Sequence, residues 1–130
     1  MATRDPIDRN LIRMELRRFQ NRCEAQEGAI RRADSLREVA RLGVIAIPFQ
    51  IGEETGALDA RAQLRRAAED RARELVEEML DRLIKAEPSA RDKIRRTIDD
   101  ALLNISGSIN AVKPWAHSRL TAVEQTLTSE

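Results

Sequence analysis

An apolar seam near the N-terminus constrains the fold of this chain more than any other feature. Its members are spaced alternately four and three residues apart, which places them on one face of an α-helix. A helix with such a face must be covered by another helix, so the seam predicts packing between helices. The seam consists of Ile12, Leu16, Phe19, Cys23, Gln26, Ile30 and Ala33.

A comparable seam occurs near the C-terminus, and the amino-acid composition favours the same interpretation. Phe19, Phe49 and Trp115 are the only aromatic residues, and tyrosine is absent. Seams made of Ala, Leu and Ile suit close-packed helices better than sandwiches or barrels. The sequence therefore predicts the all-α class. The second seam consists of Ile98, Leu102, Ile105, Ile109, Val112 and Ala116.

Proline, glycine and capping residues divide the chain into three predicted helices. Asp5-Pro6 is a favourable helix start, because an acidic N-cap precedes a proline at the first helical position. Pro48 interrupts the apolar run that follows the first helix. We expect one domain over residues 1–130, with a first helix at about 6–46, an apolar turn at 43–52, a second helix at about 58–86, and a third helix at about 89–128 that is kinked at Pro114.

These segments predict an elongated antiparallel hairpin of the first two helices, with the kinked third helix packed along it as a coiled-coil-like three-helix bundle. Gly28 weakens the first helix, but the seam keeps its phase there and the pair Glu27 and Arg31, at i and i+4, supports continuity. Near Arg37 the phase slips, which indicates a local stutter.

The inventory of reactive side chains argues against an enzyme. His117 is the only histidine and Cys23 the only cysteine, so nucleophilic triads and multi-ligand zinc sites lack their parts. Four carboxylates on the second helix lack the histidines of di-metal bundles, which makes a solvated acidic face the simpler interpretation. We expect no catalytic residue, no cofactor and no metal. The four carboxylates are Glu74, Glu77, Glu78 and Asp81.

The apolar turn is the predicted docking site, because so many large apolar side chains do not fit inside a narrow helical tip. It could be covered by the third helix, by another protein or by lipid, and the sequence leaves these open. Trp115 is a predicted anchor. The docking residues are Val44, Ile45, Ile47, Phe49 and Ile51, and the residues predicted to mediate helix association are Ile12, Leu16, Phe19, Ile30, Ile105 and Ile109.

The leading functional hypothesis is a non-catalytic assembly or adaptor protein, a homo-oligomer or a component of a larger complex such as a virion or secretion machine. One alternative is a membrane-surface protein that inserts residues 43–51 into lipid. Another is a nucleic-acid binder using an arginine strip on the first helix, although the net charge of only +1 makes nucleic acid an unfavoured partner. The single cysteine and the lack of an apolar N-terminal stretch predict a cytoplasmic location.

Overall fold

The structure, a computed structural model, describes residues 6–52 and 54–129, and within these ranges the chain is all-α with no strand. The predicted fold class is thereby confirmed. Asp5, the predicted N-cap of the first helix, lies outside the described residues. The elements in chain order are α1 (Pro6–Arg32), α2 (Leu36–Leu42), α3 (Thr55–Lys85), the 3₁₀ helix η1 (Pro88–Ala90), α4 (Arg91–Leu102), the 3₁₀ helix η2 (Gly107–Val112) and α5 (Lys113–Thr128).

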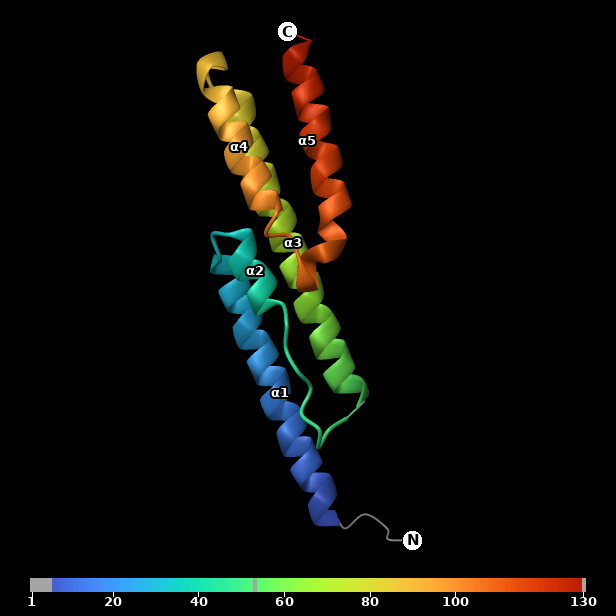
Figure 1. Cartoon of the computed structure of the whole chain (residues 1–130). Helices are drawn as coiled ribbons and strands as arrows, with labels where there is room; N and C mark the ends of the chain where they lie inside the picture. Colours follow the sequence, from blue (N-terminus) through green and yellow to red (C-terminus); the bar gives the residue numbers. More distant parts are fainter. Residues whose placement is uncertain (1–5, 53, 130) are drawn as a thin grey trace.

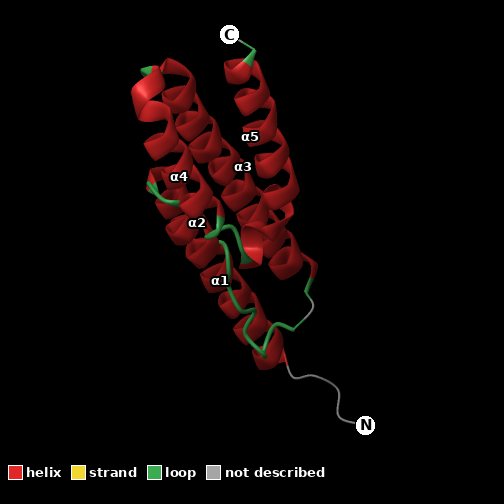
Figure 2. Ribbon diagram, turned by 45° about the horizontal axis from the view of Figure 1, so that its top comes forward, coloured by secondary structure: helices red, strands yellow, loops and turns green. Residues whose placement is uncertain are grey.

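The helices form an elongated bundle around the long helix α3 (Figure 1). One half of the bundle consists of α1 beside the N-terminal half of α3, and the other half consists of α4 and α5 on the C-terminal half of α3. Near the middle, η2 packs against α2, α3 and α5. Figure 2 shows the long segment between α2 and α3 as a loop that follows the helices rather than as a tight turn.

The two long helices that were predicted to pair, α1 and α3, run parallel and not antiparallel. Gly56 at the start of α3 lies beside Leu16 and Gln20 in the middle of α1. At the other end of the contact, the Arg71 guanidinium donates hydrogen bonds from Nε (3.1 Å) and Nη2 (2.9 Å) to the carbonyl oxygen of Ala33, just after α1. Residues further along α3 therefore meet residues further along α1, which defines a parallel pair.

The chain reverses direction directly after α1, which is why α1 and α3 are parallel. The first helix does not continue to residue 46 but ends at Arg32, and α2 begins after Ser35. Ser35 is the N-cap of α2: its backbone is extended, and its Oγ accepts a hydrogen bond from the backbone N–H of Glu38 at 3.2 Å. The phase slip near Arg37 is thus a reversal of the chain and not a stutter within one helix.

The segment from Gly43 to Gly52, which we call the return segment, brings the chain back along α1 to the start of α3 (Figure 1). It was predicted to be a turn at the tip of a hairpin. Instead, residues 44–48 have no regular secondary structure, and residues 49–52 form a turn. Helix α3 then begins at Thr55, slightly before the predicted position 58, and ends at Lys85, close to the predicted 86.

The predicted third helix is divided into α4, η2 and α5, and Pro114 does not kink it. The break occurs at residues 103–106. Gly107, directly after the break, adopts a positive φ of 56° that permits the sharp change in direction. Pro114 lies in the first turn of α5, where a missing backbone N–H removes no helical hydrogen bond. Consequently α4 and α5 lie against each other in opposite directions, and Arg95 of α4 is 3.8 Å from Glu124 of α5.

The hydrophobic core consists of two clusters that share α3. The larger cluster joins α2, α3, α4, η2 and α5, and it includes the fully buried side chains of Leu64, Leu80 and Ile109. The smaller cluster joins α1 to the return segment and the start of α3 through Phe19, Cys23, Ile51 and Ala57. The smaller cluster holds together the end of the molecule where the candidate functional site lies.

Candidate functional site

Most of the predicted association residues are buried within the chain itself. Phe19, Ile30 and Ile109 are fully buried, and Ile105 is 1% exposed. Ile12 and Leu16 are half-buried against the smaller cluster. The two seams therefore bring together helices of one chain, and only the part of the first seam nearest the N-terminus is incompletely covered.

The predicted docking residues of the return segment separate into two sets with different surroundings. Ile45 and Ile47 are half-buried against the smaller cluster, and Ile51 is 4% exposed within it. Val44, by contrast, is 61% exposed. Three of the five predicted docking residues therefore contribute to the core within the chain, and Ile45 packs against the larger cluster as well as the smaller one.

Phe49 is the most exposed of the predicted docking residues. Its side chain is 98% exposed, although it is one of the largest apolar groups in the chain. It lies on a turn in which the backbone N–H groups of Ile51 (3.1 Å) and Gly52 (3.2 Å) both donate to the carbonyl oxygen of Pro48. Gly52 supplies the positive φ of 52° that closes this turn. The buried Ile51 fixes one side of the turn, so Phe49 is presented to solvent from an anchored backbone.

The first turns of α1 add two further exposed apolar side chains at the same end of the molecule. Leu11 is 53% exposed and Met14 is 51% exposed, and their spacing of three residues makes them neighbours on the helix surface. In Figure 1 the start of α1 extends past the lowest point of the return segment. We call Leu11, Met14 and Phe49 the hydrophobic end.

Sequence reasoning missed Leu11 and Met14, because both lie outside the seam. The signal that could have identified them is their i, i+3 spacing on a face of the helix that the seam does not occupy. Such a second apolar face on a helix whose first face is already used indicates a further contact.

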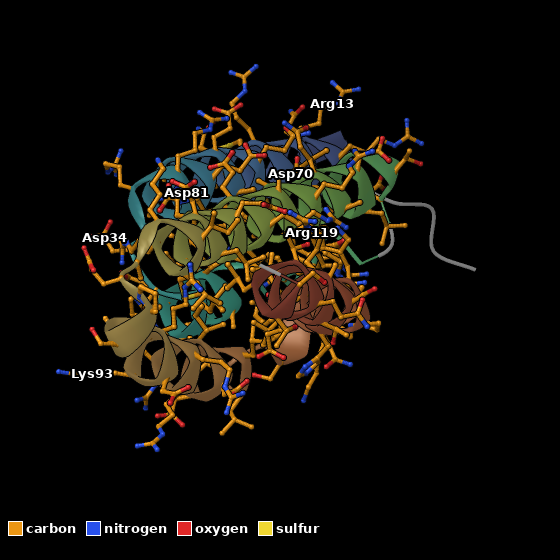
Figure 3. All side chains as sticks on the ribbon, turned by 90° about the horizontal axis from the view of Figure 1, so that it is seen from above. Arg13, Asp34, Asp70, Asp81, Lys93 and Arg119 are labelled. Carbon is orange, nitrogen blue, oxygen red and sulfur yellow. The ribbon has the colours of Figure 1, made fainter. Side chains whose placement is uncertain are left out.

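Exposed arginine side chains lie on both helices of this half of the molecule. On α1, Arg9, Arg13 and Arg17 follow one another at four-residue spacing on exposed positions, and Figure 3 shows Arg13 pointing away from the bundle. On the N-terminal half of α3, Arg61, Arg65 and Arg66 line a shallow groove beside Leu58. Among the described residues, none of these six arginines forms an ion pair with a carboxylate. This half of the molecule therefore presents apolar groups among positive charges.

The predicted anchor, Trp115, lies away from this end. It is half-buried at the start of α5 and packs against the larger core cluster. The next turn of α5 is held to α3 by Arg119, whose Nε and Nη2 donate to the two carboxylate oxygens of Glu77 at 2.8 Å and 3.1 Å. Figure 3 shows Arg119 between these helices. The hydrogen bonds and charge of Arg119 hold the pKa of Glu77 below its ordinary value, against a smaller opposing effect of burial.

The reactive side chains of the chain are dispersed. His117 is exposed on α5, whereas Cys23 is buried between α1 and α3. Burial, and secondarily the charge of Glu27, raises the pKa of the Cys23 thiol, while Arg22 opposes this effect. In the part of the chain that the structure describes, no group of three or more His, Cys, Asp or Glu side chains is arranged to hold a metal ion.

Comparison with protein-family models, with curated proteins and with solved structures finds no match for this chain. None of the helices in residues 6–52 and 54–129 combines the length and apolar character needed to cross a membrane. The fold and the surface together define an all-α bundle whose most distinctive surface feature is the hydrophobic end.

Proposed function

We propose that this protein is a non-catalytic helical adaptor that binds another protein through the hydrophobic end. The observation that carries this proposal is the 98% exposure of Phe49 on a turn whose backbone is fixed by the buried Ile51. A large aromatic side chain on an anchored turn gains free energy when a partner covers it, and the fixed backbone of the turn loses little conformational entropy on binding. Aromatic anchors of this kind carry much of the binding energy in protein interfaces.

The charges around the hydrophobic end indicate the kind of partner. On α1 and α3, arginines that form no ion pair with any described residue favour a partner that combines apolar side chains with carboxylates. A second copy of this chain docking end to end would bring Arg9, Arg13 and Arg17 against their own equivalents, and like charges in contact oppose association. We therefore assign the hydrophobic end to a different protein, and dimerisation through the same surface is the competing outcome.

The broader setting we propose is a larger cytoplasmic assembly. Most of both seams is covered within the chain, so the bundle does not need a partner helix to complete its core. Its elongated shape separates the hydrophobic end from α4 and α5 at the other end (Figure 1). This separation suits a protein that connects two components of a complex.

The experiment is a co-purification from the native host with the unmodified chain and two matched variants. Phe49→Asp places a charge on the hydrophobic end, and Leu103→Asp makes the same change at a 74% exposed residue between α4 and η2. Because both side chains are exposed, neither change disturbs the core. The proposal expects a partner that co-purifies with the Leu103→Asp variant in normal amount and is lost with Phe49→Asp. Equal recovery with both variants would contradict it.

The membrane alternative is tested by the same pair of variants on vesicles that contain anionic lipid. The structure supports this alternative less, because Ile45, Ile47 and Ile51 would have to leave the smaller cluster before residues 43–51 could enter lipid. Co-sedimentation that requires Phe49 but not Leu103 would replace the protein partner by a membrane surface. The nucleic-acid alternative predicts binding through the arginines that falls steeply with salt.

A further inference from the structure

A polar groove of about 440 Å³ lies between α1 and the start of α3, separate from the hydrophobic end. The two helices approach closely there because α3 has a glycine at the contact: a Cβ at Gly56 would lie only 3.0 Å from the side-chain nitrogen of Gln20. The side chains that define the chemistry of the groove are Arg17, Gln20, Glu24 and Glu27 of α1 and Asp59 and Gln63 of α3.

Glu27 lines this groove as a buried carboxylate without a partner. The residue is 6% exposed, yet no described residue donates a hydrogen bond to it or forms an ion pair with it. Arg31, which the sequence predicts to pair with it, is exposed on the next turn and does not do so. Burial of an unpaired carboxylate is costly, because the charge loses water without gaining a counter-charge.

The carboxylate of Glu27 remains accessible from the groove. Both of its oxygens keep some contact with solvent, because neither is fully buried. The groove as a whole carries three carboxylates, those of Glu24, Glu27 and Asp59, against the single guanidinium of Arg17. The amide oxygens of Gln20 and Gln63 add neutral acceptors. The groove therefore has an excess of negative charge, and its amides, which include Asn21, offer both acceptors and donors.

We propose that this groove binds a guanidinium group, with Glu27 as its principal hydrogen-bond acceptor. A guanidinium carries five N–H donors and no acceptor, so it complements a site made of carboxylates and amide oxygens. Its planar fork donates two parallel hydrogen bonds to one carboxylate. The described carboxylates are not arranged to hold a metal ion, which makes an organic cation the better match. The guanidinium comes either from an arginine side chain of a partner protein or from a small guanidino compound.

The test is an NMR titration that follows the side-chain amide resonances of Gln20 and Gln63. The probes are N-acetyl-arginine amide, agmatine and N-acetyl-citrulline amide, which has nearly the shape of the arginine compound but no charge. The proposal expects saturable shifts with a guanidinium probe and none with the citrulline compound. Tighter binding of the arginine compound indicates a peptide source, and tighter binding of agmatine indicates a free guanidino compound. Equal responses to the arginine and citrulline compounds would overturn the proposal.

Matched variants assign the binding to Glu27. In Glu27→Gln the affinity for the guanidinium probe falls at least about tenfold, which corresponds to about 1.4 kcal/mol. Asp59→Asn, on the opposite wall, weakens binding as well, while Glu69→Gln outside the groove leaves it unchanged. Unaltered affinity in both Glu27→Gln and Asp59→Asn would contradict the assignment.

Thermal unfolding without any probe gives a second readout that does not depend on knowing the ligand. Because Glu27 is buried without a counter-charge, the Glu27→Gln variant is expected to have a melting temperature about 2 to 4 °C higher than the unmodified chain. A lower melting temperature would show that Glu27 already has a stabilising partner within the chain, and the proposal would be wrong. The groove shares only Arg17 with the arginines near the hydrophobic end. None of the three variants changes Arg17 or the hydrophobic end, so these results do not depend on the proposed adaptor function.

Discussion

Ser108 in η2 donates a hydrogen bond from its hydroxyl to the carbonyl oxygen of Ala40 in α2, at 3.0 Å and across 68 residues of sequence. This hydrogen bond holds η2 against the end of α2, at the point where the return segment begins. Gly43 lies in the same contact: a Cβ there would be 2.8 Å from the Cβ of Ala68 and 2.9 Å from the Cβ of Ser108. The absence of a side chain at Gly43 is thus what allows three elements to meet.

We expect Gly43→Ala to destabilise the protein by about 1 to 3 kcal/mol, because the new methyl group overpacks a buried contact. The measurement is urea unfolding followed by circular dichroism. Gly28→Ala is the matched control, since a Cβ there would meet nothing closer than the Arg32 guanidinium at 3.6 Å. Within α1 this control change should stabilise the protein by about 0.5 to 1 kcal/mol. Equal stability of the two variants would contradict the described packing.

Two neighbouring residues of the return segment are expected to respond differently to truncation. Ile51→Ala removes a side chain that is 4% exposed and should lower the free energy of unfolding by about 2 to 4 kcal/mol. Phe49→Ala removes a larger side chain that is 98% exposed and should change it by less than about 0.5 kcal/mol. Urea midpoints of the two variants give the comparison. A large loss of stability at Phe49 would mean that the turn packs against the bundle.

The ion pair between Arg119 and Glu77 predicts a pH dependence of stability. Since the pKa of Glu77 is lowered in the folded state, mainly by the hydrogen bonds from Arg119, the pair stabilises the protein above the unfolded-state pKa of Glu77. That stabilisation is lost as the pH falls through the lower, folded-state pKa. Melting temperatures between about pH 6 and about pH 3 should therefore fall less in Arg119→Gln than in the unmodified chain. Parallel curves for the two proteins would show that the pair does not form in solution.

The Cys23 thiol should react slowly in the folded protein. Burial raises its pKa, and the charge of Glu27 raises it further. Because the thiolate is the reactive form, both the low exposure and the high pKa slow alkylation. We expect iodoacetamide to modify Cys23 much faster in urea than under native conditions, as measured by mass spectrometry. Similar rates in both conditions would indicate that α1 separates readily from α3.

The heptad seams predicted the helical class and the buried faces correctly, because apolar periodicity reports which side of a helix is covered. They could not predict what covers it. The same spacing in α1 and α3 is compatible with parallel and antiparallel packing, and the direction depends on where the chain reverses. That information lay in Ser35-Leu36-Arg37-Glu38, whose serine and glutamate have the spacing of a capping box and mark a new helix start.

The candidate site was predicted only in part for a related reason. A run of apolar residues in the return segment indicates burial or docking but does not separate the two. The path of this segment along the bundle decides between them, since Ile45 and Ile47 are half-buried against the core and Val44 is exposed. Phe49 was identified, but Leu11 and Met14 were not, because their exposure depends on how far α1 extends past its neighbours. The unpaired state of Glu27 likewise requires the structure, because the sequence suggests a partner in Arg31.

The central claim is that Phe49 contacts a different protein, and site-specific photocrosslinking tests it most directly. A photoreactive phenylalanine analogue at position 49 keeps the aromatic ring, and the same analogue at position 103 serves as the control. We expect one crosslinked product from position 49 in the native host, heavier than the 14.7 kDa chain by the mass of another protein, and none from position 103. A product of twice the mass of the chain, a crosslink to lipid, or equal crosslinking from both positions would contradict it.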